Sequence, residues 1–160
     1  MTPGRPFTGF MVHVESHVGS EGIPDERQFE KWVRAALQGR RSKRRQVNIQ
    51  LFDPVQARQI NKTFTGKDYA TNVLSFPYEP LPGEKTAVLG DIVLCPSVVA
   101  TEAKKQGKKL RDHFAHLTVH GVLHLLGFDH KDEGEATRME DQERLVLATF
   151  GIPDPYETHT

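Results

Sequence analysis

Two segments of the chain alternate apolar and polar residues, which is the pattern of a half-buried β-strand. They span residues 10–15 and 46–52, and Val47, Ile49 and Leu51 share one face of the second segment. Between them, apolar residues recur at helical spacing and predict an amphipathic helix that packs on the sheet. These residues are Phe29, Trp32, Val33, Ala36 and Leu37.

The rest of the chain predicts two more strands and four more helices. The strands span residues 71–76 and 89–95, and the second is apolar on both faces, which places it inside the sheet. The helices span residues 54–63, 97–106, 110–126 and 132–150. We therefore expect one α+β domain, residues 1–160, in which a four-stranded mixed sheet packs against the helices.

The predicted helix at residues 110–126 is apolar nearly all round, so we expect it to be buried and central. It also carries most of the histidines of the chain. The whole sequence has 8 histidines, and five of them fall in or just after this helix: His113, His116, His120, His124 and His130. A function for this chain has to account for that cluster.

Length and charge limit the classes of function. The 160 residues fit one domain, and 21 Lys and Arg balance 21 Asp and Glu, which excludes the overall basic field of a general nucleic-acid binder. No apolar run approaches the ~18 residues of a membrane helix, and the N-terminus lacks the apolar stretch of a signal peptide. We therefore expect no membrane partner. The single cysteine, Cys95, cannot form an internal disulfide, which fits a reducing compartment, and we expect a cytoplasmic protein.

A basic segment precedes the second strand. It consists of Arg40, Arg41, Lys43, Arg44 and Arg45. One interpretation is a solvated connector between helix and strand, and the other is contact with phosphate groups. The sequence leaves both open.

Spacing makes part of the histidine cluster a candidate metal site. His120 and His124 are four residues apart and therefore lie on one face of a helix, one turn from each other. Gly127 lets the chain leave the helix in a left-handed conformation, after which His130 can fold back as a third ligand. Three imidazoles leave one position of a tetrahedral zinc ion open, as in catalytic sites, where a bound water has its pKa lowered to ~7. We expect one zinc ion here.

Other roles are possible for individual histidines and their neighbours. A single histidine in an apolar helix is more often a hydrogen-bonded core residue, but several buried imidazoles need partners, which a shared cation provides. His116 continues the stripe one turn earlier and is either an alternative ligand or part of the pocket wall. Asp129 is either a turn residue, a partner that orients a ligand imidazole, or a catalytic base. His116 and Asp129 are thus the candidates for a catalytic role.

The same spacing occurs in the extended zinc-protease signature His-Glu-x-x-His-x-x-Gly-x-x-His. The glutamate that acts as general base in peptide hydrolysis is missing, because Gly121 follows His120. A zinc metalloprotease-like hydrolase therefore remains only an alternative. The missing glutamate favours the hypothesis of phosphodiester chemistry over that of peptide hydrolysis, since a metal can act directly on phosphoryl oxygens.

Three ordered motifs resemble the YbeY family of bacterial rRNA-maturation endoribonucleases. The segment HGVLHLLGFDH is similar to the family's histidine signature, and GKDYATNVLSFP and LGDIVLC resemble its two other blocks. The resemblance implies a zincin-like fold, with His120, His124 and His130 as zinc ligands. It also implies a single-strand-specific endoribonuclease that matures the 3′ end of 16S rRNA, serves ribosome quality control, and works in the cytoplasm on the small ribosomal subunit.

The sequence departs from the family pattern at one block. Where the family usually has an arginine after an aromatic residue, this chain has Thr65, and Ala70 replaces a proline. The RNA-binding candidates that could supply the missing charge are Arg44, Arg45, Arg58 and Lys67. The departure also keeps open a non-enzymatic alternative, a ribosome assembly factor in which zinc only stabilises the fold.

Overall fold

The two alternating segments form adjacent parallel strands, β1 (Met11–Ser16) and β2 (Gln46–Leu51). The structure is a computed structural model that describes residues 11–157, so Phe10, the predicted start of the first strand, lies outside the described residues. β4 (Val88–Leu94) pairs in parallel with β2, and β3 (Val73–Pro77) pairs antiparallel with β4. The order β1-β2-β4-β3 confirms the four-stranded mixed sheet and the inner position of the strand that is apolar on both faces.

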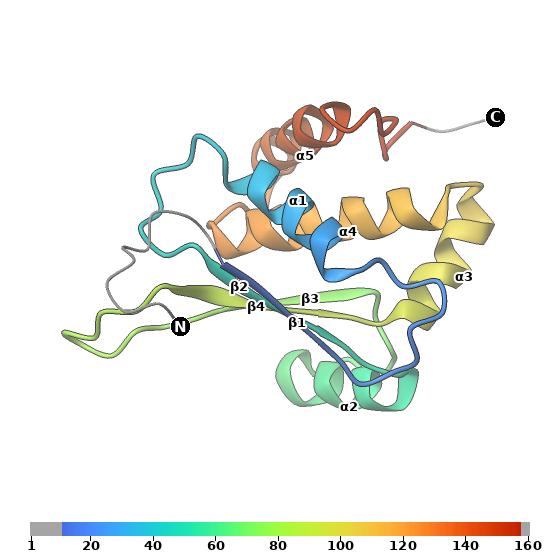
Figure 1. Ribbon diagram of the computed structural model, residues 1–160, viewed down its shortest axis with the longest axis horizontal. Helices are drawn as coiled ribbons and strands as arrows, with labels where there is room; N and C mark the ends of the chain where they lie inside the picture. Colours follow the sequence, from blue (N-terminus) through green and yellow to red (C-terminus); the bar gives the residue numbers. More distant parts are fainter. Residues whose placement is uncertain (1–10, 158–160) are drawn as a thin grey trace.

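The helices of residues 11–157 cover both faces of this sheet (Figure 1). They are α1 (Glu26–Leu37), α2 (Pro54–Thr65), α3 (Pro96–Gln106), α4 (Leu110–Leu125) and α5 (Glu133–Ala148). Aspartates fix the beginnings of α1, α2 and α5, because each accepts a hydrogen bond from a free backbone N–H of the first turn. These N-caps are Asp25, Asp53 and Asp132. The α+β class predicted from the sequence is confirmed.

The core lies between the sheet and α4. One face of the sheet carries α1 and α4, with α5 on the side of α4 away from the sheet, whereas α2 lies against the opposite face (Figure 1). Ten residues of α4 are buried, which confirms the central helix inferred from its apolar sequence. Its Phe114 and Leu123 belong to one hydrophobic cluster with Ile49 and Ile92 of the strands.

Two glycines allow close approach between these layers. A Cβ atom on Gly121 of α4 would lie 2.9 Å from Cδ1 of Ile92, and a Cβ on Gly90 of β4 would lie 2.5 Å from the carbonyl oxygen of Phe76. Real Cβ atoms do not come this close to such neighbours, so larger residues would push α4 and β3 away from β4. The fold thereby sets how near the histidine helix lies to the sheet.

Within residues 11–157, we find no helix with both the length and the apolar character needed to cross a bilayer.

Candidate metal centre

The C-terminal half of α4 brings two of the predicted ligands together. Nε2 of His120 lies 3.1 Å from Nε2 of His124, and the two ring centroids are 4.6 Å apart. The helical repeat accounts for this, because residues four apart stack on one face of a helix. Burial together with the charges of His120 and His130 lowers the pKa of His124, which favours the neutral imidazole that a metal requires.

The turn after α4 brings the third histidine to the same place. Gly127 adopts φ 102°, and the N–H of Phe128 donates to the carbonyl of Leu123, which closes the helix in a Schellman arrangement. The ring of His130 then lies 4.8 Å from that of His124 and 5.4 Å from that of His120. The left-handed glycine inferred from the sequence therefore has the conformation expected of it.

These three side chains fit a metal ion. Their ligand nitrogens lie within 4.8 Å of one another. Imidazoles on a tetrahedral zinc ion have nitrogens roughly 3.3 Å apart, close to the 3.1 Å between His120 and His124. Two neutral nitrogen lone pairs repel at that distance unless a proton or a cation lies near both. His120, His124 and His130 could hold a metal, and their role as ligands stays a prediction.

A buried carboxylate lies behind the first of these histidines. Glu143 of α5 has no exposed surface, and its Oε1 lies 2.5 Å from Nδ1 of His120. Burial raises the pKa of Glu143, but contacts with His116 and His120 outweigh this effect and lower the pKa to about 2. The group is therefore ionised at neutral pH. No motif in the sequence pointed to Glu143, although it shares the helical stripe of the buried Met139, Val146 and Leu147.

A tyrosine beyond α5 completes the surroundings of Glu143. The hydroxyl of Tyr156 donates a hydrogen bond to Oε2 of Glu143, and it lies 3.3 Å from Nε2 of His116. Burial and the hydrogen bond to Glu143 raise the pKa of Tyr156, so the hydroxyl keeps its proton. Tyr156 was not predictable from the sequence either, because no local pattern links it to α4.

The two catalytic candidates occupy different positions. His116 contacts Glu143 and Tyr156, with only 11% of its side chain exposed, and thus lies behind the three candidate ligands. Asp129 lies in the turn, where its Oδ1 accepts a hydrogen bond from the backbone N–H of His130 and is 3.4 Å from Nδ1 of that residue. Asp129 contacts a candidate ligand, and a catalytic role for either residue stays a prediction.

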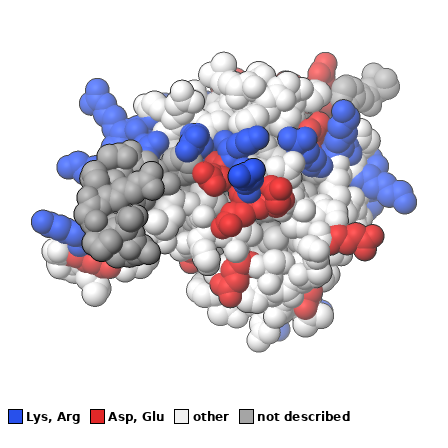
Figure 2. Space-filling view, in the orientation of Figure 1, with Lys and Arg blue, Asp and Glu red and all other residues white. Residues whose placement is uncertain are grey.

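The structure does not gather the RNA-binding candidates around the histidines. Arg44 donates to the carbonyl groups of Tyr78 and Val88, and Arg45 donates to those of Leu37 and Arg40. These bonds tie the basic segment to the ends of α1 and β4. Figure 2 shows basic side chains interspersed with acidic ones, without one continuous basic field on this face.

The remaining cationic candidates belong to α2 and the turn after it, on the far face of the sheet from α4 (Figure 1). Arg58 pairs with both carboxylate oxygens of Asp68, at 2.6 and 3.1 Å. Thr65, which stands at the family's arginine position, is exposed, and its hydroxyl lies 2.8 Å from the carbonyl oxygen of Asn61. Lys67 is exposed beside it. An RNA contact through these residues stays a prediction.

The position of Gly121 explains why it carries no glutamate. Its missing side chain would point at Ile92 of β4, not into the space between the histidines. A glutamate at this position would therefore start against the sheet. The structure thus gives no support to the alternative of a protease-like hydrolase.

Comparisons with known proteins agree with the geometry. A model of the family described as Endoribonuclease YbeY matches residues 14–151. The chain belongs to the YbeY endoribonuclease family. The endoribonuclease YbeY of Stenotrophomonas maltophilia is 54% identical over 139 residues, which are 84% of this chain and 86% of that protein. Its counterpart in Xanthomonas campestris is 52% identical, with the same coverage. The resemblance drawn from three motifs is confirmed, and with it the enzyme class.

A solved structure shares the fold described above. The solution structure of TM1509 from Thermotoga maritima has a TM-score of 0.56 and 21% sequence identity, and the match covers 92% of this chain and 99% of that one. At this level of identity the likeness concerns the fold alone.

Proposed function

We propose that this member of the YbeY family cuts single-stranded ribosomal RNA at a centre where His120, His124 and His130 hold one zinc ion. The reaction contributes to maturation of the 3′ end of 16S rRNA and to ribosome quality control. The partner is the small ribosomal subunit in the cytoplasm, and residues 1–160 act as a single catalytic domain. Family membership supports the endoribonuclease activity, and the histidine geometry supports the metal.

The convergence of three imidazoles at the end of α4 carries this proposal. Three protein ligands leave a position open on a tetrahedral ion, which distinguishes a catalytic from a structural zinc site. When bound, the ion supplies a Lewis acid for a phosphoryl oxygen and lowers the pKa of a water molecule. The chain itself holds the ligand nitrogens in place, and Asp129 orients the imidazole of His130 through the contact at 3.4 Å.

Cleavage is expected to depend on both the metal and the form of the RNA. Protein with a measured zinc content is incubated with a single-stranded fragment of 16S rRNA, with the same fragment in a duplex, and with a peptide. We expect cleavage of the single strand only, loss of cleavage after chelation, and recovery when zinc is restored. Cleavage by protein shown to be metal-free would contradict the zinc centre. Intact RNA throughout would favour the assembly-factor alternative.

The ends of the products distinguish two routes of attack. A 2′,3′-cyclic phosphate indicates attack by the neighbouring ribose 2′-hydroxyl, whereas direct attack by water leaves a linear phosphate. Mass spectrometry of the cleaved fragments separates the two cases, and a cyclic product would exclude water as the sole attacking group.

Replacing Thr65 with arginine is expected to strengthen RNA binding. The position is exposed at the end of α2, so the longer side chain can extend into solvent. One added phosphate contact should raise the affinity for single-stranded RNA several-fold and steepen its dependence on log salt concentration by about 0.7. Fluorescence anisotropy at several salt concentrations measures both quantities.

Thr65→Gln serves as the matched control, since it adds length without charge. An unchanged affinity and salt slope in Thr65→Arg would mean that the charge missing from this block is compensated elsewhere or has no part in RNA binding.

A further inference from the structure

The carboxylate behind the candidate metal centre has a different partner close to each oxygen, and Nε2 of His116 lies farther off, 3.6 Å from Oε1. Oε1 of Glu143 lies 2.5 Å from Nδ1 of His120, and Oε2 accepts the hydroxyl proton of Tyr156. With no exposed surface, the charge of Glu143 is not solvated by bulk water. Burying a charge of this kind costs free energy unless hydrogen bonds satisfy it, so both partners contribute to keeping the carboxylate in place.

The first contact determines where the proton of His120 lies. A carboxylate oxygen accepts a hydrogen bond from an imidazole N–H, so the 2.5 Å contact between Oε1 of Glu143 and Nδ1 of His120 places the proton of the neutral ring on Nδ1. Its lone pair is then on Nε2, the atom that lies 3.1 Å from Nε2 of His124. A carboxylate on the outer nitrogen of a ligand histidine fixes the tautomer and the ring orientation and raises the basicity of the ligating nitrogen.

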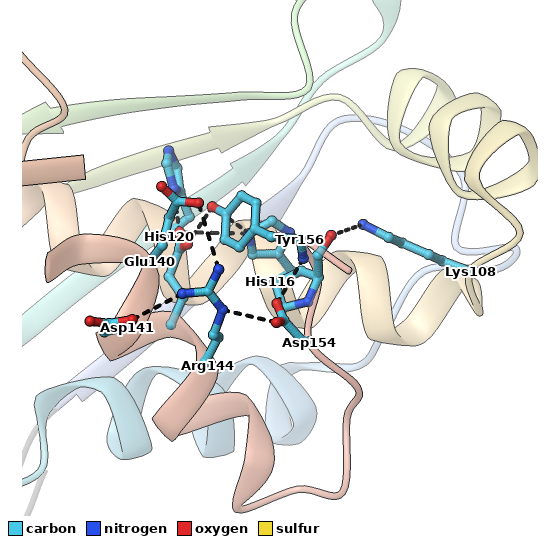
Figure 3. Close-up of polar contacts among 10 residues, drawn as sticks. Lys108, His116, His120, Glu140, Asp141, Arg144, Asp154 and Tyr156 are labelled. Atoms are coloured by element: carbon cyan, nitrogen blue, oxygen red, sulfur yellow. Dashed lines mark hydrogen bonds and ion pairs between the residues drawn. The ribbon is translucent and has the colours of Figure 1, made fainter. Parts of the chain in front are cut away.

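The second contact depends on a short segment beyond α5. Arg144 of α5 donates to Oδ2 of Asp154 at 2.9 Å, while Oδ1 of Asp154 accepts the backbone N–H of Tyr156 at 2.9 Å. Lys108 donates to the carbonyl of Pro155, also at 2.9 Å. Figure 3 shows these contacts converging on Tyr156, whose ring lies beside His116. They hold the tyrosine hydroxyl over Glu143.

We propose that Glu143 and Tyr156 are a positioning pair that sets the tautomer and orientation of His120 for metal binding. The inference rests on the proposed metal centre and assigns the segment at residues 154–156 a part in it. Tyr156 holds Glu143, Glu143 holds the Nδ1 proton of His120, and Nε2 of His120 is left free to bind. In this arrangement Glu143 and Tyr156 act through His120 and are not themselves ligands.

Zinc affinity provides the first test. Glu143→Gln keeps the volume of the side chain but removes its charge, and we expect the affinity for zinc to fall about 10–100-fold. Tyr156→Phe removes only the hydroxyl, and a loss of several-fold is expected. Competition with a chromophoric chelator measures the affinity, and thermal unfolding of the metal-free proteins reports whether each variant folds.

Glu140→Gln is the matched control. It removes the same charge three residues away on α5, where Glu140 lies 3.9 Å from Arg144. We expect its zinc affinity to equal that of the wild type. A folded Glu143→Gln and a folded Tyr156→Phe that both bind zinc as tightly as the wild type would overturn the proposal. If Glu143→Gln does not fold, Tyr156→Phe alone decides the question.

The proton on His120 gives a second readout that needs no metal. Nitrogen-15 NMR of the metal-free protein, recorded at a pH at which the ring signals are those of a neutral imidazole, shows which nitrogen carries it. We expect the proton on Nδ1 in the wild type and a shift towards Nε2 in Glu143→Leu. A proton on Nε2 in the wild type would overturn the positioning pair. A proton on Nδ1 in a protein that does not bind zinc would contradict only the proposed function.

Discussion

Replacing His124 with alanine is expected to abolish zinc binding and RNA cleavage together. The ring centroid of His124 is 4.6 Å from that of His120 and 4.8 Å from that of His130. Loss of a group that only supports a ligand costs 10–100-fold in metal affinity, so loss of a ligand itself should cost more than about 100-fold. Zinc content after dialysis, measured by mass spectrometry, and cleavage of single-stranded rRNA test the two effects.

The fold of this variant should survive. His124 is only partly buried at the end of α4, so we expect the free energy of unfolding of the metal-free protein to change by about 1 kcal/mol or less. Zinc should raise the melting temperature of the wild type and leave that of His124→Ala unchanged, because only a protein that binds the ion is stabilised by it. His13→Ala, at an exposed position of β1, controls for the loss of a histidine as such.

Two outcomes would count against the zinc mechanism. One is RNA cleavage by His124→Ala at the wild-type rate in the absence of bound metal. The other is normal zinc occupancy in the variant, which would move the metal away from this group of histidines.

The histidine group was predictable because it depends on local geometry. Four residues of helix bring His124 beside His120, and one left-handed glycine, Gly127, returns the chain so that His130 can join them. Each step follows from backbone rules that act over a few residues. Helix boundaries were predictable for the same reason, since a capping aspartate or glycine determines the end of the helix turn next to it.

The surroundings of the site were not predictable in this way. Glu143 is 23 residues from His120 in sequence, and their contact exists only because α5 packs on α4. The sequence does show a carboxylate, Glu143, on the apolar face of α5. The periodicity of the helix does not tell which side chains this carboxylate contacts. Arg44 and Arg45 illustrate the converse, because a run of basic residues drew attention to phosphate while both side chains bind backbone carbonyl groups.

Gly121 shows that comparison with a motif can suggest a catalytic meaning for a residue whose role is in packing. Compared with the protease signature, it is the position of a missing catalytic base. In the structure it is a packing position, where α4 lies against Ile92 of β4. We therefore expect a glutamate at position 121 to destabilise the fold and to give no peptidase activity.

Gly121→Glu is therefore expected to destabilise the fold severely. Its Cβ would lie 2.9 Å from Cδ1 and 3.2 Å from Cγ1 of Ile92, and the carboxylate would enter the layer between helix and sheet. Overpacking of a core costs about 1–3 kcal/mol, and an unpaired buried carboxylate adds several kcal/mol unless it takes up a proton. We expect a loss of at least about 3 kcal/mol in the free energy of unfolding, measured by urea denaturation, with no cleavage of a peptide substrate.

Gly121→Ala separates the size of the side chain from its charge. Alanine is favoured over glycine in a helix by about 1 kcal/mol, which offsets part of the displacement of the Ile92 side chain. This variant should therefore stay within about 1 kcal/mol of the wild type and retain its zinc, because the histidine face of α4 is unchanged. If Gly121→Glu were as stable as Gly121→Ala and cleaved peptides, position 121 would face the metal centre, and the packing of α4 on β4 described here would be wrong.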